Sequence, residues 1–401
     1  MKIGIIREGK TPPDMRVPLT PDQCRFVNEN MPGFEVVVQP SGIRCFPDEA
    51  YRHHGIRLQE DLSECDVLMG VKEVPVKDLI PGKVYFFFSH TIKQQPHNRE
   101  LLREILKRKI QLVDYETLTD KDGNRIIGFG RFAGLAGTYN GLRAYGLRNG
   151  WYDLKPAYLC KDVEEMYNEL ANIDLPAIKI VLTGGGRVAG GALELFARIG
   201  IRQAGVEEYL KQGKSGGPVF VQLNPGDYNL HIEGRPFDLI HFYNHPEAYR
   251  GNFTRFLPET DLLVAAAYWD PAAPVLFTVE DTRKPDFRVS VIADITCDID
   301  GSVPTTRRAS TIEEPFYDFD PLSGEIRPPF SGEGNITVMA VDNLPCELPV
   351  DASIDFGRTL IEKVLPDLSG GGPGDLIERA SITKDGRLTA RFLYLRDYAG
   401  H

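Results

Sequence analysis

The sequence lacks the features that mark several classes of protein. It has no uninterrupted apolar run near the roughly 20 residues that span a membrane, and the apolar stretch at Met1–Arg7 is too short for a secretory signal. Its 6 cysteines form no CxxC pair and its 8 histidines show no ligand spacing, so we expect free thiols, a cytoplasmic location and no metal. The net charge of −11 disfavours nucleic acid and anionic membranes as partners.

The chain instead alternates short apolar runs with helical patterns, which indicates an α/β fold. We predict strands at 2–6, 34–38, 67–71, 84–88, 111–115, 178–183, 239–242, 262–266 and 289–293. We predict helices at 20–29, 48–54, 99–108 (capped by Asn98), 128–149, 162–170, 190–198 and 352–364. Gly370–Gly374 has the composition of a linker.

Two of these strands run into side chains that can carry a proton. The first is followed by Lys72 and Glu73, and the second by Ser89 and His90. Because the carboxyl ends of parallel strands meet at one edge of a sheet, we expect Lys72 and His90 to lie side by side as an acid–base pair, with Glu73 tuning or neutralising the lysine. The alternatives are a solvated strand-end lysine and a histidine packed in the core.

A glycine-rich turn follows the predicted strand at 178–183. Gly184, Gly185, Gly186, Arg187, Val188 and Ala189 fit the pattern G-x-G-x-x-(G/A) between a strand and a helix. Such a turn lets the backbone approach a pyrophosphate at the helix N-terminus. The pattern therefore predicts a dinucleotide site, with a turn that binds no ligand as the alternative.

The residue that would bind the ribose is less clearly marked. Glu207 and Glu208 lie 23 and 24 residues beyond Gly184, and we take Glu208 as the candidate if 204–209 is the second strand. The stretch 219–223 competes for that position and ends at Asn224, which is not an acid. Lys211 and Lys214 follow closely and would suit a 2′-phosphate. NAD and NADP both stay open, with a slight preference for NAD.

Longer motifs resemble a known group of enzymes. The stretches Arg16–Pro21, Gly70–Glu73, Phe86–Lys93 and Phe129–Gly134 resemble the alanine dehydrogenase and saccharopine dehydrogenase superfamily. Within it, the lysine–ketoglutarate reductase (saccharopine dehydrogenase, lysine-forming) branch shows the strongest likeness, through Tyr268-Trp269, Asp294–Asp298, Val341–Pro345 and Leu348-Pro349.

The resemblance implies a protein of two Rossmann-like lobes with a cleft between them. A discontinuous substrate domain (1–130, completed by 345–401) would hold an inserted NAD(P)-binding domain (131–344). The implied reaction interconverts saccharopine with L-lysine and 2-oxoglutarate through an imine, using a nicotinamide cofactor. The oligomeric state is not indicated.

The resemblance also implies roles for individual residues. Lys72 and His90 fall on the acid–base pair, Arg16 and Arg125 on carboxylate-binding arginines, Lys93 and Glu116 on the substrate pocket, and Asp298 on an acid near the nicotinamide. Arg16 has the alternative of bridging to Asp14 or Asp22, Arg125 that of an ordinary hairpin residue, and Asp298 competes with Asp294.

Two other functions stay open. One is an alanine dehydrogenase or another opine or amino-acid dehydrogenase of the superfamily, and the other is a regulator that binds a nucleotide without catalysis. Saccharopine carries three carboxylates and two amines, so the cluster of charged residues in the first lobe favours it over alanine.

Overall fold

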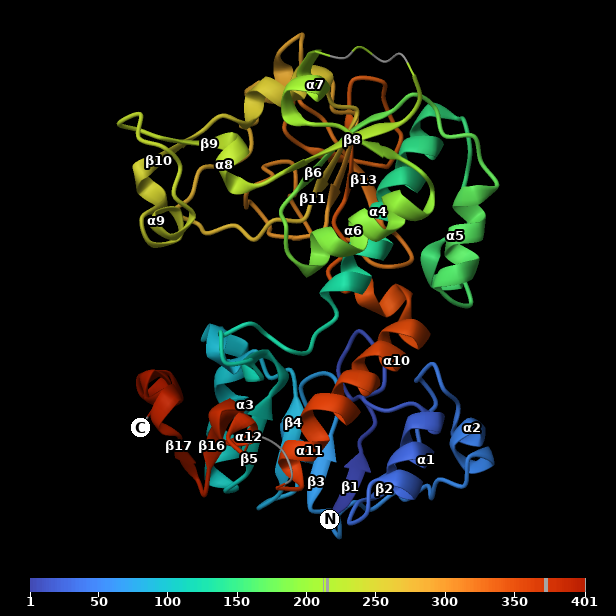
Figure 1. Cartoon of the computed structure of the whole chain (residues 1–401), viewed down its shortest axis with the longest axis vertical. Helices are drawn as coiled ribbons and strands as arrows, with labels where there is room; N and C mark the ends of the chain where they lie inside the picture. The colour runs from blue at the N-terminus through green and yellow to red at the C-terminus, as the bar shows by residue number, and fades with distance from the viewer. Residues whose placement is uncertain (212, 214–215, 371–373, 401) are drawn as a thin grey trace. The chain divides into compact units, whose positions relative to one another are not determined.

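The computed structural model describes residues 1–211, 213, 216–370 and 374–400, and the chain divides into two compact units. Unit 1 comprises Met1–Phe129 and Pro349–His401, and unit 2 comprises Gly130–Leu348 (Figure 1). Lys214 and residues 371–373 of the expected linker lie outside the described residues. The roles expected for the two domains stay predictions.

Unit 1 is built on a seven-stranded sheet of order β17-β16-β5-β4-β3-β1-β2. Its strands are β1 (Lys2–Ile5), β2 (Glu35–Val38), β3 (Val67–Met69), β4 (Val84–Phe87), β5 (Gln111–Asp114), β16 (Ser381–Lys384) and β17 (Arg387–Leu388). The first five are parallel and lie side by side in Figure 1. Their continuous apolar runs are buried, as expected for strands covered on both faces.

The helices of unit 1 mostly follow the expected pattern. They are α1 (Pro21–Asn30), α2 (Asp48–His53), α3 (Arg99–Lys107), α10 (Pro349–Thr359), α11 (Leu365–Leu368), α12 (Leu376–Ala380) and α13 (Arg396–Ala399). Thr20 and Gln23 form a capping box at the start of α1. The cap predicted for α3 is wrong: Asn98 itself has helical backbone angles, so its side chain makes no capping bond.

Unit 2 is built on an eight-stranded sheet of order β14-β13-β15-β12-β11-β6-β8-β7. Its strands are β6 (Lys179–Thr183), β7 (Arg202–Gln203), β8 (Val219–Leu223), β11 (Leu262–Ala265), β12 (Val291–Asp294), β13 (Phe316–Phe319), β14 (Ile326–Arg327) and β15 (Ile336–Met339). β13 runs antiparallel to β15 and β14, and the other pairings are parallel. The order in which the parallel strands are added to the sheet reverses at β6, which lies between β8 and β11.

The helices of unit 2 are α4 (Gly130–Asn149), α5 (Val163–Ala171), α6 (Arg187–Arg198), α7 (Val206–Lys211), α8 (Pro225–Tyr228) and α9 (Leu239–Asn244). With α8 and α9, the hairpin of β9 (Asn229–His231) and β10 (Tyr249–Gly251) forms an arm that projects to one side of the unit (Figure 1). The strand predicted at 239–242 is wrong. Asp238 caps a helix there, since its side chain accepts a bond from the backbone N–H of His241.

Glycines let α4 and α6 pack backbone to backbone. A Cβ atom added to Gly134 would lie 1.9 Å from the Val188 carbonyl oxygen, and one added to Gly191 would lie 2.0 Å from that of Arg131. Arg131 and Glu194 then join the two helices through two bonds of 2.6 Å. This contact fixes the position of the start of α6, which directly follows the glycine turn.

Among the described residues, the structure contains no helix that is both long and apolar enough to cross a lipid bilayer.

Candidate active site

The ends of β3 and β4 in unit 1 bring three ionisable side chains together. His90 Nδ1 lies 2.5 Å from Glu73 Oε1, and Lys10 Nζ donates to Glu73 Oε2 at 2.8 Å. The hydrogen-bond partner of His90 is therefore the carboxylate beside Lys72, whereas sequence reasoning paired the histidine with the lysine itself. Since Nδ1 is held by Glu73, Nε2 is the nitrogen that remains for proton exchange with a substrate.

Charge and burial shift the proton affinities of this group. Burial raises the pKa of Glu73, but the bonds from His90 and Lys10 outweigh it and lower that pKa to about 2. Burial, together with the nearby cations Arg16 and Lys10, lowers the pKa of Lys72. Glu73 is thus a permanent anion at neutral pH, and Lys72 gives up its proton more readily than a surface lysine does.

Arg16 lies beside these residues in a buried ion pair with Asp14. Its Nε donates to Asp14 Oδ1 at 2.9 Å and its Nη2 to Oδ2 at 2.5 Å, and its guanidinium lies 4.1 Å over the Phe129 ring. The pair holds the pKa of Asp14 well below its usual range, against the effect of burial. The bridge to Asp14, weighed above as an alternative for Arg16, is present.

A second charged group lies at the end of β5, next to β4. Glu116 Oε1 accepts a bond from Arg125 Nη2 at 3.1 Å and lies 3.7 Å from Lys93 Nζ. The other oxygen, Oε2, is buried and has no hydrogen-bond partner among the described residues. Lys93 and Arg125 remain about half exposed, with 50% and 44% of their side-chain surfaces accessible. The group therefore offers a buried acceptor and two accessible cations to one ligand.

In unit 2, the glycine turn lies where a phosphate can reach it. Gly184 has φ of +97°, and a Cβ there would lie 3.0 Å from the Ala266 carbonyl oxygen. Gly185, Gly186 and Arg187 are exposed. The 12-residue helix α6 begins at Arg187, and no side chain caps its first N–H groups. The turn and helix therefore fit a pyrophosphate group.

Helix α6 starts three residues before the predicted position 190, so Arg187, Val188 and Ala189 form its first turn. Ala189 is buried.

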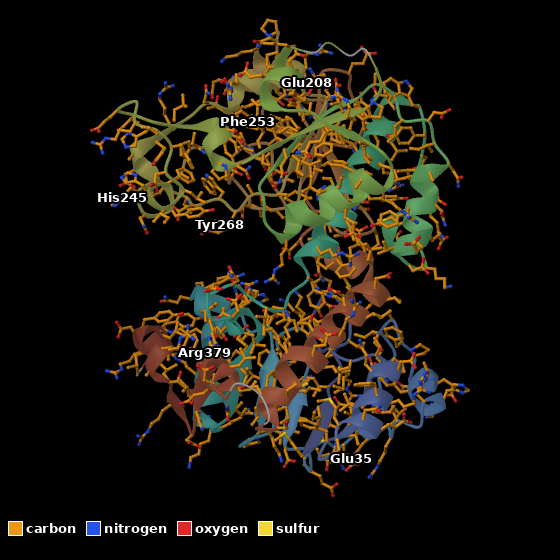
Figure 2. All side chains as sticks on the ribbon, viewed as in Figure 1. Glu35, Glu208, His245, Phe253, Tyr268 and Arg379 are labelled. Atoms are coloured by element: carbon orange, nitrogen blue, oxygen red, sulfur yellow. The ribbon has the colours of Figure 1, made fainter. Side chains whose placement is uncertain are left out.

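The structure contradicts the expectation for Glu208. Residues 206–211 are helix α7, because the second parallel strand is β8, which pairs with β6 along its whole length. The Tyr209 carbonyl in α7 accepts a hydrogen bond of 2.6 Å from the side chain of Lys179, the first residue of β6. The glycine turn follows Thr183, the last residue of the same strand. Five residues of strand span about 16 Å. Glu208 lies at the opposite end of the sheet, as its separation from Tyr268 in Figure 2 shows, and pairs with Arg202.

A cavity of about 410 Å³ opens at the carboxyl ends of β6, β8 and β11. Its walls include Thr183, Tyr228, Asn229, Tyr268, Trp269 and Asp270. Trp269 anchors its loop, since its indole donates to the carbonyls of Ala273 and Pro274, whereas Tyr268 is 82% exposed. The signal for this wall was an aromatic pair directly after a buried strand.

Comparison with known proteins places the chain. Residues 4–136 match the family described as alanine dehydrogenase/PNT, N-terminal domain. The chain is 31% identical to alpha-aminoadipic semialdehyde synthase of Arabidopsis thaliana, over 98% of this chain and 41% of that protein. It is 25% identical to saccharopine dehydrogenase [NAD(+), L-lysine-forming] of Emericella nidulans, over 91% of both chains. Over nearly its whole length the chain thus resembles the alanine dehydrogenase and saccharopine dehydrogenase superfamily.

Two solved structures share this fold. An L-alanine dehydrogenase aligns with a TM-score of 0.65 and 19% identity over the full length of both chains. A transhydrogenase from Sinorhizobium meliloti aligns with a TM-score of 0.60 and 15% identity, over 97% of this chain and 100% of that one. The predicted superfamily and the predicted α/β fold with two Rossmann-like lobes are confirmed.

The chain spans less than half the length of the plant relative and also of the mouse alpha-aminoadipic semialdehyde synthase, which it matches with 30% identity over 98% of itself and 47% of that protein.

The acidic loop after β12 resembles the saccharopine branch in sequence, and the structure separates its two candidate acids. Asp294 is buried and accepts bonds from Thr296 and Thr306, and burial raises its pKa to about 6. Asp298 is exposed and follows Cys297, which has φ of +53°. Asp294 thus shapes the loop, and the expected role beside the nicotinamide stays a prediction for Asp298.

Among the described residues, no group of three or more histidine, cysteine, aspartate or glutamate side chains is placed to hold a metal ion.

Proposed function

We propose that this chain is a nicotinamide-dependent oxidoreductase that interconverts saccharopine with L-lysine and 2-oxoglutarate through an imine. The observation that carries the proposal is the pair of charged groups at one edge of the unit 1 sheet: Glu73 with Lys10 and His90, and Glu116 with Lys93 and Arg125. The name of the Emericella relative supports saccharopine and L-lysine as substrates.

The substrate's charges match the second group. Two cations, Lys93 and Arg125, are accessible to a carboxylate, which guanidinium binds with two parallel bonds. The buried Glu116 Oε2 lacks a donor, and the ammonium of an amino acid supplies one. We infer that this group holds an amino-acid head. A single small amino acid such as alanine would leave part of this charge unused.

Proton transfer falls to His90. In the reductive direction the lysine amine adds to the oxo carbon, water leaves the carbinolamine, and the imine carbon is reduced. The bound nicotinamide supplies the hydride for that last step. His90 Nε2 can take the proton that the amine releases and return it to the leaving hydroxyl, because Glu73 Oε1 holds Nδ1 and leaves Nε2 for the exchange. Lys72, with its lowered pKa, is the second proton carrier.

Unit 2 fits the cofactor. The glycine turn and the start of α6 suit the pyrophosphate, and the 410 Å³ cavity with its aromatic walls suits the adenine end. β8 is followed by Asn224, whose Oδ1 would lie 3.0 Å from a Cβ on Gly185, beside the turn. Among the described residues, those that line the cavity include Asp270 and no lysine or arginine. A 2′-phosphate finds no cation in this lining, so we propose NAD in preference to NADP.

The reaction is tested by following reduced-nicotinamide absorbance with L-lysine plus 2-oxoglutarate, and separately with ammonia plus pyruvate. We expect turnover only with the first pair, and faster with NADH than with NADPH. Turnover with ammonia and pyruvate alone would instead identify an alanine dehydrogenase. Nucleotide binding without turnover of either pair would identify a regulator. The cytoplasmic location stays a prediction.

A further inference from the structure

Glu8 is a buried acid that the proposed chemistry leaves unused. It follows β1, and its carboxylate lies under the turn that continues β3. Glu8 Oε1 accepts the backbone N–H of Val71 at 2.6 Å, and Oε2 accepts that of Lys72 at 2.8 Å. Two successive backbone donors thus converge on one carboxylate, an arrangement that backbone concavities use to hold anions.

Gly70 makes this approach possible. A Cβ on Gly70 would lie 2.8 Å from Ile6 Cδ1 and 3.3 Å from Glu8 Oε1, so a side chain there would push the end of β1 away. The sheet ladder holds the turn only as far as Val71, whose carbonyl accepts the N–H of Phe88. Beyond that point, the bond from the Lys72 N–H to Glu8 is what ties the backbone down.

We infer that Glu8 is a positioning residue for the acid–base group. The turn that it clamps carries Lys72 and Glu73, and Glu73 in turn holds His90 Nδ1 and Lys10 Nζ. Glu8 therefore acts on His90 through the backbone of residues 71 and 72 and through the Glu73 carboxylate. The inference rests on the proposed function for its effect on turnover.

Burial favours the neutral form of the Glu8 carboxyl at neutral pH, and its two oxygens still accept the backbone N–H bonds. Burial raises the pKa of Glu8 to about 8, although the two N–H bonds and the nearby Arg16 favour its ionised form. The cost of burying the Glu8 carboxyl is tolerated because the two hydrogen bonds that it accepts hold the neighbouring turn in place.

The test compares Glu8→Ala and Glu8→Gln with Glu60→Gln. Glu60 lines the same cavity of about 370 Å³ as Glu8 and pairs with Arg7 at the surface, so its substitution is the matched control. Hydrogen exchange of the Val71 and Lys72 amides and steady-state kinetics are measured for each. Exchange should rise most in Glu8→Ala and less in Glu8→Gln, which keeps one acceptor oxygen. It should be unchanged in Glu60→Gln.

Turnover should follow the same order. We expect kcat to fall about 100-fold in Glu8→Ala, with intermediate loss in Glu8→Gln and little change in KM, because misplaced proton carriers slow chemistry more than binding. Unchanged exchange in Glu8→Ala overturns the clamp, and raised exchange with normal kcat overturns the positioning role. If Glu8→Ala does not fold, Glu8→Gln decides both points. A wild-type chain inactive with lysine and 2-oxoglutarate would sink the proposed function, while the exchange result would still decide whether Glu8 holds the turn.

Discussion

The parallel strands of the two units end in different chemistry. In unit 1 they end in charge: Lys72 and Glu73 follow β3, and Glu73 pairs with Lys10 and with His90, which follows β4. In unit 2 they end in glycine, an amide at Asn224 and the aromatic pair Tyr268-Trp269. Open α/β sheets expose a site at the carboxyl ends of their strands in both cases. The difference supports our proposal that unit 1 carries out proton transfer and unit 2 binds the cofactor.

Replacing His90 should have the largest effect, because it should remove proton transfer in unit 1 and leave cofactor binding in unit 2 unchanged. In His90→Gln we expect kcat to fall about 100- to 10,000-fold, the usual size of a general acid–base contribution, with unchanged affinity for NADH. Steady-state kinetics and a fluorescence titration with NADH measure the two quantities. His97→Gln, at an exposed position in the same unit, is the control. A normal kcat in His90→Gln would remove the histidine from the mechanism.

Two glutamates, one in each unit, extend the contrast to pH. The bonds from His90 and Lys10 lower the pKa of Glu73 in unit 1 to about 2, despite burial. Burial raises the pKa of Glu347 in unit 2 to about 8, where its partner is the neutral amide of Asn140, 2.8 Å away. A carboxyl whose pKa is raised in the folded state contributes stability at pH values below about 4.5, the pKa in the unfolded chain. That contribution is lost as the pH rises towards 8. For Glu73 the sign is opposite, and stability is lost as pH falls from about 4.5 towards 2.

Denaturant unfolding across these two windows checks the signs. Relative to Glu347→Gln, the wild-type chain should lose a few kcal/mol between pH 5 and 8, because each pKa unit corresponds to about 1.4 kcal/mol. Relative to Glu73→Gln, it should lose stability only below about pH 4.5. Parallel pH dependences for wild type and Glu347→Gln would show that Glu347 ionises in the folded state as it does in the unfolded chain.

How far sequence reasoning reached differs between the units. In unit 1 the apolar runs ending at Lys72 and His90 predicted adjacent strand ends, because register and side-chain burial fix parallel strands strongly. The Glu73–His90 bond was not predicted, since a neighbour in sequence does not show which partner a side chain selects. In unit 2 the turn was found, but Glu208 was misplaced because a short helix, α7, intervenes between β7 and β8. That Glu116 Oε2 is buried without a hydrogen-bond donor could be found only from the three-dimensional structure.

A pair of glycines tests the packing behind the cofactor turn. In Gly134→Ala the new Cβ would lie 1.9 Å from the Val188 carbonyl oxygen, so α6 must move, and we expect a loss of about 1 to 3 kcal/mol of stability and weaker NADH binding. Gly190→Ala, in the same helix pair, meets nothing within 4 Å and should gain up to about 1 kcal/mol. Thermal unfolding with and without NADH distinguishes them. Equal effects of the two substitutions would refute the close contact.

Arg125→Ala is expected to have the smallest effect, and it best distinguishes which substrate the Glu116 group binds. Arg125 binds Glu116 at 3.1 Å and is 44% exposed, so solvent screens part of its charge. We expect KM for one carboxylate-bearing substrate to rise about tenfold, which is one charge-assisted hydrogen bond after screening, while kcat changes little. Lys121→Ala, exposed on the same turn, is the control. Whether KM rises for lysine or for 2-oxoglutarate identifies which end of saccharopine this group holds, and an unchanged KM for both would make Arg125 an ordinary hairpin residue.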